Sequence, residues 1–378
     1  YADTEALAAL SRALELTAAP TPIAPRLHFD LLLLRENSHQ RHGRREQQLA
    51  DLRQLAALLP NLNDRELTCV FWRRQVIYDK DINDYASQQV HLDCFKREAA
   101  ALGSLYWQAE VMFAEGVYLK ILDKYQTAVV RLQEALDVYH QAQCVEGQVD
   151  CCCQLAEIFV INRQSAEAEL WTQRALALCP SEQPTPQLMY ILWSMAANGL
   201  ISKDLPRCLD YAARLLRSAE QGGVHFWQAA AHRLLGMAYQ RQFLISAAQR
   251  SLNAALELYR QMQHPKGMSL TLQTMGHVEV SLGRYAAASR HYQTAFELVE
   301  KLNDVDGMAT ECLNLAYAAA LQADYAAEGA YARRALVYAR QVQNRHLEGL
   351  ALQNLGEVER EGGDLTAARQ YQMAALAL

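Results

Sequence analysis

An internal repeat of 40 residues is the feature that most constrains this chain of 378 residues. The stretch Leu235–Leu256, LGMAYQRQFLISAAQRSLNAAL, shares its skeleton with Met275–Phe296, Leu315–Leu336 and Leu355–Leu376. A small residue returns every 40 positions, as Gly116, Ala156, Ala196, Gly236, Gly276, Ala316 and Gly356. Repetition at a fixed period of this size is typical of one supersecondary structure stacked many times over.

Two more columns of small residues follow the first. The second column lies 12 residues later and comprises Ala128, Ala168, Cys208, Ala248, Ala288, Glu328 and Ala368. The third comprises Ala135, Ala175, Leu215, Ala255, Ala295, Ala335 and Ala375. Small residues let two helices approach closely, and their large apolar neighbours fill the remaining space. We therefore expect each repeat to be a pair of helices. Glu328 interrupts the second column, where Ala326 or Ala327 could take its place after a small helix rotation.

This pattern resembles the tetratricopeptide repeat family, whose 34-residue unit has a Leu-Gly pair on its first helix and two alanines on its second. The matching residues here include Leu235, Gly236, Ala248 and Ala255, and the resemblance covers at least residues 106–378. Longer repeats of this kind are similar to the sensor domains of large bacterial signal-transduction ATPases. The resemblance implies an all-α fold, a right-handed α-solenoid superhelix of about nine helix-turn-helix units.

The repeat and the prolines predict three parts of the chain. Residues 1–25 hold a helix and the proline-rich hinge AAPTPIAP, residues 26–104 hold two divergent helical hairpins, and residues 105–378 hold seven regular repeats. Glycines mark four of the loops between repeats, at Gly147, Gly267, Gly307 and Gly349. We expect each of these glycines to supply the backbone freedom that a tight turn requires.

Composition and charge exclude several functions. The net charge of −6 and the pI near 6.0 argue against a nucleic-acid-binding surface. The chain has no apolar run of membrane-spanning length and no signal peptide, so we expect a cytoplasmic piece of a longer protein. The nine cysteines lack zinc spacing and are interpreted as small core residues in a reducing compartment. We expect neither a metal nor a cofactor.

No catalytic motif is present, neither a phosphate-binding loop nor HExxH, GxSxG or a kinase signature. The chain is therefore predicted not to be an enzyme. Only scattered His, Glu and Gln residues support the alternative of a phosphatase or a transferase.

The resemblance implies that ligands bind in a concave groove lined by the first helices. Its ligand-facing positions lie three residues before the first small column, one after it, and four or five after it. They give the candidate groove residues Phe113, Trp193, Arg233, Met237, Gln240, Arg241 and His277. An aromatic residue with two arginines suits a carboxylate-bearing ligand. The alternative is that these side chains only form the groove wall or pack between repeats.

The function that we predict is a non-enzymatic sensor or interaction domain of a multidomain bacterial signalling protein. It would bind a protein, a peptide or a small effector and act on a neighbouring nucleotide-binding domain. The alternative is a passive protein–protein interaction scaffold. The last repeat finishes with the apolar residues Ala374, Leu376 and Leu378, which predict self-association through this end.

Overall fold

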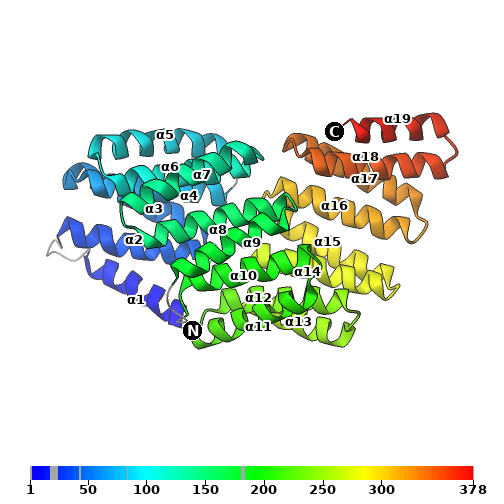
Figure 1. The fold of residues 1–378 in the computed structure, drawn as a ribbon, viewed down its shortest axis with the longest axis horizontal. Helices are drawn as coiled ribbons and strands as arrows, with labels where there is room; N and C mark the ends of the chain where they lie inside the picture. The colour runs from blue at the N-terminus through cyan, green and yellow to red at the C-terminus, as the bar shows by residue number, and fades with distance from the viewer. Residues whose placement is uncertain (1, 18–23, 42–43, 83, 180–183, 378) are drawn as a thin grey trace. The chain divides into compact units, whose positions relative to one another are not determined.

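The fold is a series of helical hairpins. A computed structural model describes residues 2–17, 24–41, 44–82, 84–179 and 184–377, and the regular secondary structure within these ranges is all α-helical. Consecutive helices pack as hairpins (Figure 1). These findings confirm the all-α helical-repeat fold. The chain forms two compact units, unit 1 from Tyr1 to Ser202 and unit 2 from Lys203 to Leu378.

Ten helices belong to unit 1 and nine to unit 2, counted over the described residues. Unit 1 contains α1 (Ala2–Thr17), α2 (Pro25–Arg41), α3 (Arg45–Leu62), α4 (Arg65–Asp81), α5 (Tyr85–Leu102), α6 (Leu105–Ile121), α7 (Tyr125–Gln141), α8 (Val145–Ile161), α9 (Ser165–Leu178) and α10 (Pro186–Ile201). Unit 2 contains α11 (Leu205–Gln221), α12 (His225–Arg241), α13 (Ile245–Gln261), α14 (Pro265–Ser281), α15 (Tyr285–Lys301), α16 (Val305–Ala320), α17 (Tyr325–Gln341), α18 (Arg345–Glu361) and α19 (Leu365–Leu376).

The 40-residue period extends to the start of α2. The even-numbered helices α2 to α18 are the first helices of their repeats, and they begin at residues 25, 65, 105, 145, 186, 225, 265, 305 and 345. The described chain therefore has nine repeats, as predicted. Helix α3 contains Pro60 and continues past it to Leu62. A proline is tolerated there because only one hydrogen bond near the end of the helix is lost.

The first small column lies where the two helices of a repeat touch. A Cβ atom on Gly236 of α12 would lie 2.6 Å from the Leu252 side chain of α13, and one on Gly276 of α14 would overlap the ring of Tyr292 of α15. On Gly356 it would lie 3.3 Å from the carbonyl oxygen of Ala368, a residue of the second column. The columns therefore mark close helix contacts, as the sequence predicts.

Glu328 keeps its place in the second column, so the predicted rotation toward Ala326 or Ala327 is wrong. Glu328 is buried, whereas Ala326 is exposed. Ala332 and Ala335 lie further along the same helix and are fully buried, so a rotation would pull them out of the core. Burial raises the pKa of the Glu328 carboxyl, and the charges of two glutamates on α18 raise it further.

The glycines between repeats do not serve as flexible turn residues. Gly147, Gly267 and Gly307 lie in the first turns of α8, α14 and α16, and none has a positive φ. The left-handed positions are taken by the residues four places earlier, Gln143, Gln263 and Asn303.

Close approach explains these glycines instead. A Cβ atom on Gly147 or Gly267 would overlap a tyrosine ring of the preceding helix, and one on Gly307 would lie 2.9 Å from Val299. Gly349 lies two residues out of this register, and its nearest neighbour would be a carbonyl oxygen 4.0 Å away.

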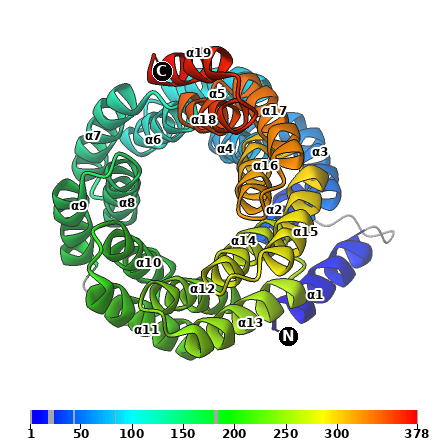
Figure 2. The ribbon, with the colours of Figure 1, turned by 90° about the vertical axis from the view of Figure 1, so that its right-hand side faces the viewer.

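Within each unit the first helices lie closer together than the second helices. In unit 1, α4 contacts α6, α6 contacts α8 and α8 contacts α10; in unit 2, α12 contacts α14, α14 contacts α16 and α16 contacts α18. Over the described residues no contact of this extent joins neighbouring second helices. Figure 2 shows α12, α14 and α16 in one layer and α13, α15 and α17 in another. We call these the first-helix layer and the second-helix layer of each unit. The first-helix layer lies on the concave side of its own unit.

No helix in the described ranges has both the length and the apolar character needed to cross a bilayer.

Candidate ligand-binding surface

The candidate residues of unit 2 lie together on α12 and α14. Arg233 Nη1 is 3.5 Å from Met237 Sδ, one helical turn away. Gln240 Nε2 donates a hydrogen bond of 3.0 Å to Ser281 Oγ, which in turn donates to the His277 carbonyl oxygen. Arg241 is exposed at the end of α12. The bond from Gln240 to Ser281 therefore joins the neighbouring first helices α12 and α14. The role of the candidate residues in binding stays a prediction.

Phe113 and Trp193 belong to unit 1 and pack within it. Phe113 contacts a core cluster that includes Leu132 and Leu155. The Trp193 ring lies 5.7 Å from the Tyr190 ring, centroid to centroid. Both side chains are only half-buried, so each combines packing with a face that remains accessible.

Four polar side chains of unit 1 bind one another in a network that includes Tyr190, the neighbour of Trp193. Lys120 Nζ is 2.8 Å from Glu157 Oε2 and donates to Gln154 Oε1 at 2.6 Å, while the Tyr190 hydroxyl donates to Glu157 Oε2 at 2.7 Å. Burial is the largest single influence on the Glu157 carboxyl and would raise its pKa. The Lys120 charge and the hydrogen bonds from Lys120 and Tyr190 together outweigh burial, so the pKa is lowered. Lys120 and Glu157 occupy ligand-facing positions, and only the structure shows that they engage each other.

A second ion pair of unit 1 joins α4 to α6. Arg73 Nε lies 2.7 Å from Oε2 of Glu110, a carboxylate that is almost fully buried. Asp150 of α8 lies near this pair. Burial raises the pKa of its carboxyl to about 6, against the lowering effect of the Arg73 charge.

Arg233 of unit 2 has no carboxylate partner among the described residues. Its Nε atom is buried without a hydrogen bond. Burial raises the pKa of Tyr259, and Arg233 opposes this rise through its charge and a hydrogen bond. The guanidinium group is therefore held by a hydroxyl and a thioether, with its charge uncompensated.

Further along the same layer lies a polar cluster with a buried carboxyl. The Tyr292 hydroxyl is 3.0 Å from His277 Nδ1, and burial lowers the pKa of His277. Asn314 Nδ2 donates to Glu311 Oε2 at 3.1 Å. Burial raises the pKa of Glu311 to about 7. Glu311 was not among the predicted site residues, although the 40-residue register indicates that it is buried. The same position in other repeats holds buried residues, namely Cys151, Ile191, Ala231, Thr271 and Ala351.

No group of three His, Cys, Asp or Glu side chains in the described part of the chain is arranged to hold a metal ion. The three consecutive cysteines of α8 are buried, and burial raises the pKa of each thiol, that of Cys152 to about 11. Thiols in this state are poor nucleophiles at neutral pH because little thiolate is present.

Comparison with solved structures defines the class of protein. A Rap protein complexed with the competence and sporulation factor is similar with a TM-score of 0.66 and 13% identity, over 92% of this chain and 97% of that one. NprR in complex with its cognate peptide NprX has a TM-score of 0.59 and 14% identity, over 92% and 97%. A signal-transduction ATPase with a tetratricopeptide repeat sensor from Pyrococcus horikoshii has a TM-score of 0.53 and 11% identity, over 88% of this chain and 52% of that one.

The chain is thus a tetratricopeptide-like α-solenoid. No protein-family model and no curated protein matches it. At these identities the structural likeness shows the fold alone. One more similar structure, aspartyl phosphate phosphatase F from Bacillus subtilis, bears an enzyme's name (TM-score 0.55, 11% identity, over 95% of this chain and 96% of that one).

Proposed function

We propose that this chain is a non-enzymatic binding module that takes up a peptide or a segment of a protein partner on the first-helix layer of unit 2. The observation that carries the proposal is the set of half-buried side chains on α12 and α14, namely Arg233, Met237, Gln240 and His277. These side chains present hydrogen-bond donors, a hydrogen-bond acceptor and the flexible apolar side chain of Met237 on the concave side of the unit. NprR, which shares the fold, was solved with its cognate peptide, and this supports a peptide as the partner.

A display library of random peptides tests the proposal. We expect the chain to select peptides. Met237→Ala and Gln240→Ala should weaken peptide binding by about tenfold or more, because both side chains belong to the proposed binding surface of the first-helix layer. Glu297→Ala on the exposed side of α15 is the matched control and should leave binding unchanged. An equal loss in the control, or no selected peptide at all, would contradict the proposal.

In its more specific form, the proposal is that the chain is a sensor that acts on a neighbouring nucleotide-binding domain. Each contact between repeats can shift slightly and the shifts add up, so a peptide that prefers one curvature would change the dimensions of unit 2. Likeness to the signal-transduction ATPase with a tetratricopeptide repeat sensor supports this role. Small-angle scattering with and without a selected peptide separates the sensor from a passive scaffold, whose dimensions would stay the same.

The fold shared with a named phosphatase favours a second candidate, an enzyme that hydrolyses acyl phosphates. A turnover screen with acetyl phosphate and phosphorylated proteins, with Arg233→Ala alongside, tests it. Turnover that the variant loses would support the enzyme and count against a purely binding role.

A further inference from the structure

The third position before the first small column carries a charge in only two of the nine repeats. Those residues are Arg73 on α4 and Arg233 on α12, separated by four periods of 40 residues. The other seven repeats have Leu33, Phe113, Cys153, Trp193, Gln273, Leu313 and Gln353 there. Arg73 and Arg233 therefore start from equivalent places on equivalent helices, and each can serve as a reference for the other.

Arg73 shows what an arginine at this position requires. The next first helix brings Glu110 to it, with Nε and Oε2 2.7 Å apart and the carboxylate nearly buried. The hydroxyls of Tyr106 and Tyr139 also bond to Glu110. A guanidinium group that is partly removed from water is thus matched by a carboxylate held in place.

Arg233 lacks such a paired carboxylate among the described residues. Adding the same four periods to Glu110 leads to Leu270 on α14, whose side chain is 38% exposed. Arg233 Nε is buried without a hydrogen bond, Nη1 lies 3.5 Å from the Met237 sulfur, and the guanidinium group also hydrogen-bonds to Tyr259. No carboxylate is paired with it in the described part of the chain. A partly buried charge without a counter-charge costs free energy. The position that Glu110 fills beside Arg73 is taken here by an apolar side chain that remains open to solvent.

We propose that a carboxylate of the bound partner docks on Arg233, in the place that Glu110 holds on Arg73. This inference rests on the proposed function, since the partner is the peptide or protein segment taken up by unit 2. Arginine binds carboxylates through two parallel N–H···O bonds, and Met237 and Gln240 lie further along the same helix to contact the rest of the segment. The carboxylate belongs to a C-terminus or to an Asp or Glu side chain, which share this chemistry.

The first experiment uses acetate and needs no peptide. The thermal unfolding midpoint of the whole chain is measured in sodium acetate and in sodium chloride of equal ionic strength. We expect acetate to stabilise the wild type more than it stabilises Arg233→Gln or Leu270→Glu, because the first variant removes the site and the second fills it internally. Arg250→Gln, on an exposed position of α13, should behave as wild type. An equal acetate effect in all four proteins would overturn the proposal.

Leu270→Glu is the sharper of the two variants, because it copies an arrangement that the chain already contains in Arg73 and Glu110. It should fold with a wild-type circular dichroism spectrum and an unchanged or higher midpoint. Arg233→Gln gives the same readout by a different route, so a folding defect in one variant leaves the other to decide.

The second experiment compares soluble peptides selected from a random library as free acids, as C-terminal amides and with Asp and Glu replaced by Asn and Gln. We expect the loss of one carboxylate, terminal or internal, to weaken peptide binding by about tenfold or more. Leu270→Glu should weaken the binding of the peptides that keep this carboxylate by a similar factor. The arm that loses affinity identifies the source of the carboxylate.

The outcomes separate this inference from the function beneath it. If peptides bind and neither their carboxylates nor Leu270→Glu matter, the inference is wrong and the peptide-binding function stands. If acetate distinguishes wild type from Leu270→Glu but no peptide binds, the carboxylate site stands and the peptide-binding function is wrong.

Discussion

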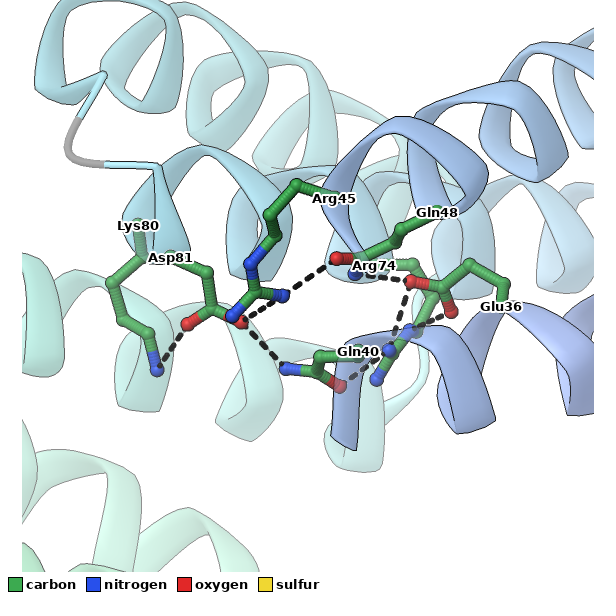
Figure 3. A network of polar contacts seen from close by, with 7 residues as sticks. All are labelled: Glu36, Gln40, Arg45, Gln48, Arg74, Lys80 and Asp81. Carbon is green, nitrogen blue, oxygen red and sulfur yellow. Dashed lines mark hydrogen bonds and ion pairs between the residues drawn. The ribbon is translucent and has the colours of Figure 1, made fainter. Parts of the chain in front are cut away.

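Gln48 Nε2 donates a hydrogen bond of 2.7 Å to Glu36 Oε1, and both side chains are completely buried between α2 and α3 (Figure 3). By the 40-residue register, Glu36 occupies the first small column and Gln48 the second. The first repeat thus makes with a polar pair the contact that later repeats make with glycine and alanine. Arg74 of α4 completes it, donating from Nε to Glu36 Oε2 at 2.6 Å and from Nη2 to Oε1 at 2.9 Å.

This network predicts that the stability of unit 1 depends strongly on the Glu36 carboxylate. Glu36→Gln leaves the Arg74 guanidinium group without its charged partner in a buried site, and we expect a loss of about 3 kcal/mol in unfolding free energy. In the Arg74→Met background the same change should cost less, with a coupling energy above about 1 kcal/mol. Urea unfolding followed by tryptophan fluorescence measures all four proteins of the cycle.

The control for this cycle is Arg26→Met, which removes the exposed pairs of Arg26 with Asp30 at 3.4 Å and with Asp64 at 3.3 Å. An exposed ion pair contributes at most about 1 kcal/mol to stability, so this change should have little effect on the unfolding free energy. Additive effects of Glu36→Gln and Arg74→Met would show that the two side chains do not stabilise each other.

Replacing glycine by alanine should have opposite effects on stability at a close helix contact and at an open position of a helix. Gly276→Ala places a methyl group against the fully buried Tyr292 ring and should destabilise unit 2 by about 1 to 3 kcal/mol. Gly349→Ala, with an open position on α18, should stabilise it by up to about 1 kcal/mol because alanine favours the helix. Denaturant unfolding of both variants checks the pair, and destabilisation by Gly349→Ala would contradict the assignment.

Glu311 predicts that unit 2 becomes less stable as pH rises toward neutrality. Burial raises its pKa from 4.5 to about 7, so the folded chain keeps a proton that the unfolded chain has already released. The stabilisation is complete below pH 4.5 and is lost as pH rises through about 7. A shift of this size corresponds to about 3 kcal/mol.

Glu311→Gln should remove this part of the pH dependence, because the amide does not titrate. Unfolding free energies of wild type and variant are compared across the window from pH 4.5 to 7, with Glu300→Gln at an exposed position as the control. Parallel pH profiles for wild type and Glu311→Gln would show that the buried carboxyl does not control the slope.

Self-association through α19 remains a prediction, and the structure shows which side chains to change. Leu376 is 86% exposed and Met373 is 61% exposed, whereas the residues at the position of Leu376 in α7 and α15, Leu136 and Phe296, are buried. Apolar faces of this kind favour association in water. Leu378, the third residue of the predicted interface, lies outside the described residues.

Light scattering over a concentration series measures this association. We expect the mass of the wild type to rise with concentration and Met373→Glu with Leu376→Glu to stay monomeric. Val337→Glu, at a similarly exposed position of α17, should associate as wild type does. A wild type that stays strictly monomeric at high concentration would refute the predicted interface.

Much of the fold was predictable because small side chains at a fixed spacing report where helices touch. Gly236 and its counterparts identify the first helices, and Pro25, Pro186 and Pro265 are the first residues of three of them. The first repeat looked divergent because Glu36 and Gln48 replace small residues with a hydrogen-bonded pair. Composition cannot distinguish such a pair from a break in the pattern. Phe113 and Trp193 lie in unit 1 and Arg233 lies in unit 2, so their grouping into one binding surface stays a prediction.

The sequence by itself determined the helical hairpins, their number and the side of each helix that packs, because backbone approach depends on side-chain size and the 40-residue period records that size at every contact. Only the tertiary structure decided which polar groups are satisfied. Arg73 and Arg233 occupy equivalent positions, but Arg73 faces Glu110, whereas Arg233 faces no carboxylate in the part of the chain that the structure describes. A hydrogen bond depends on distance and direction between atoms on separate helices, so the pairing becomes visible only when the helices are placed in space.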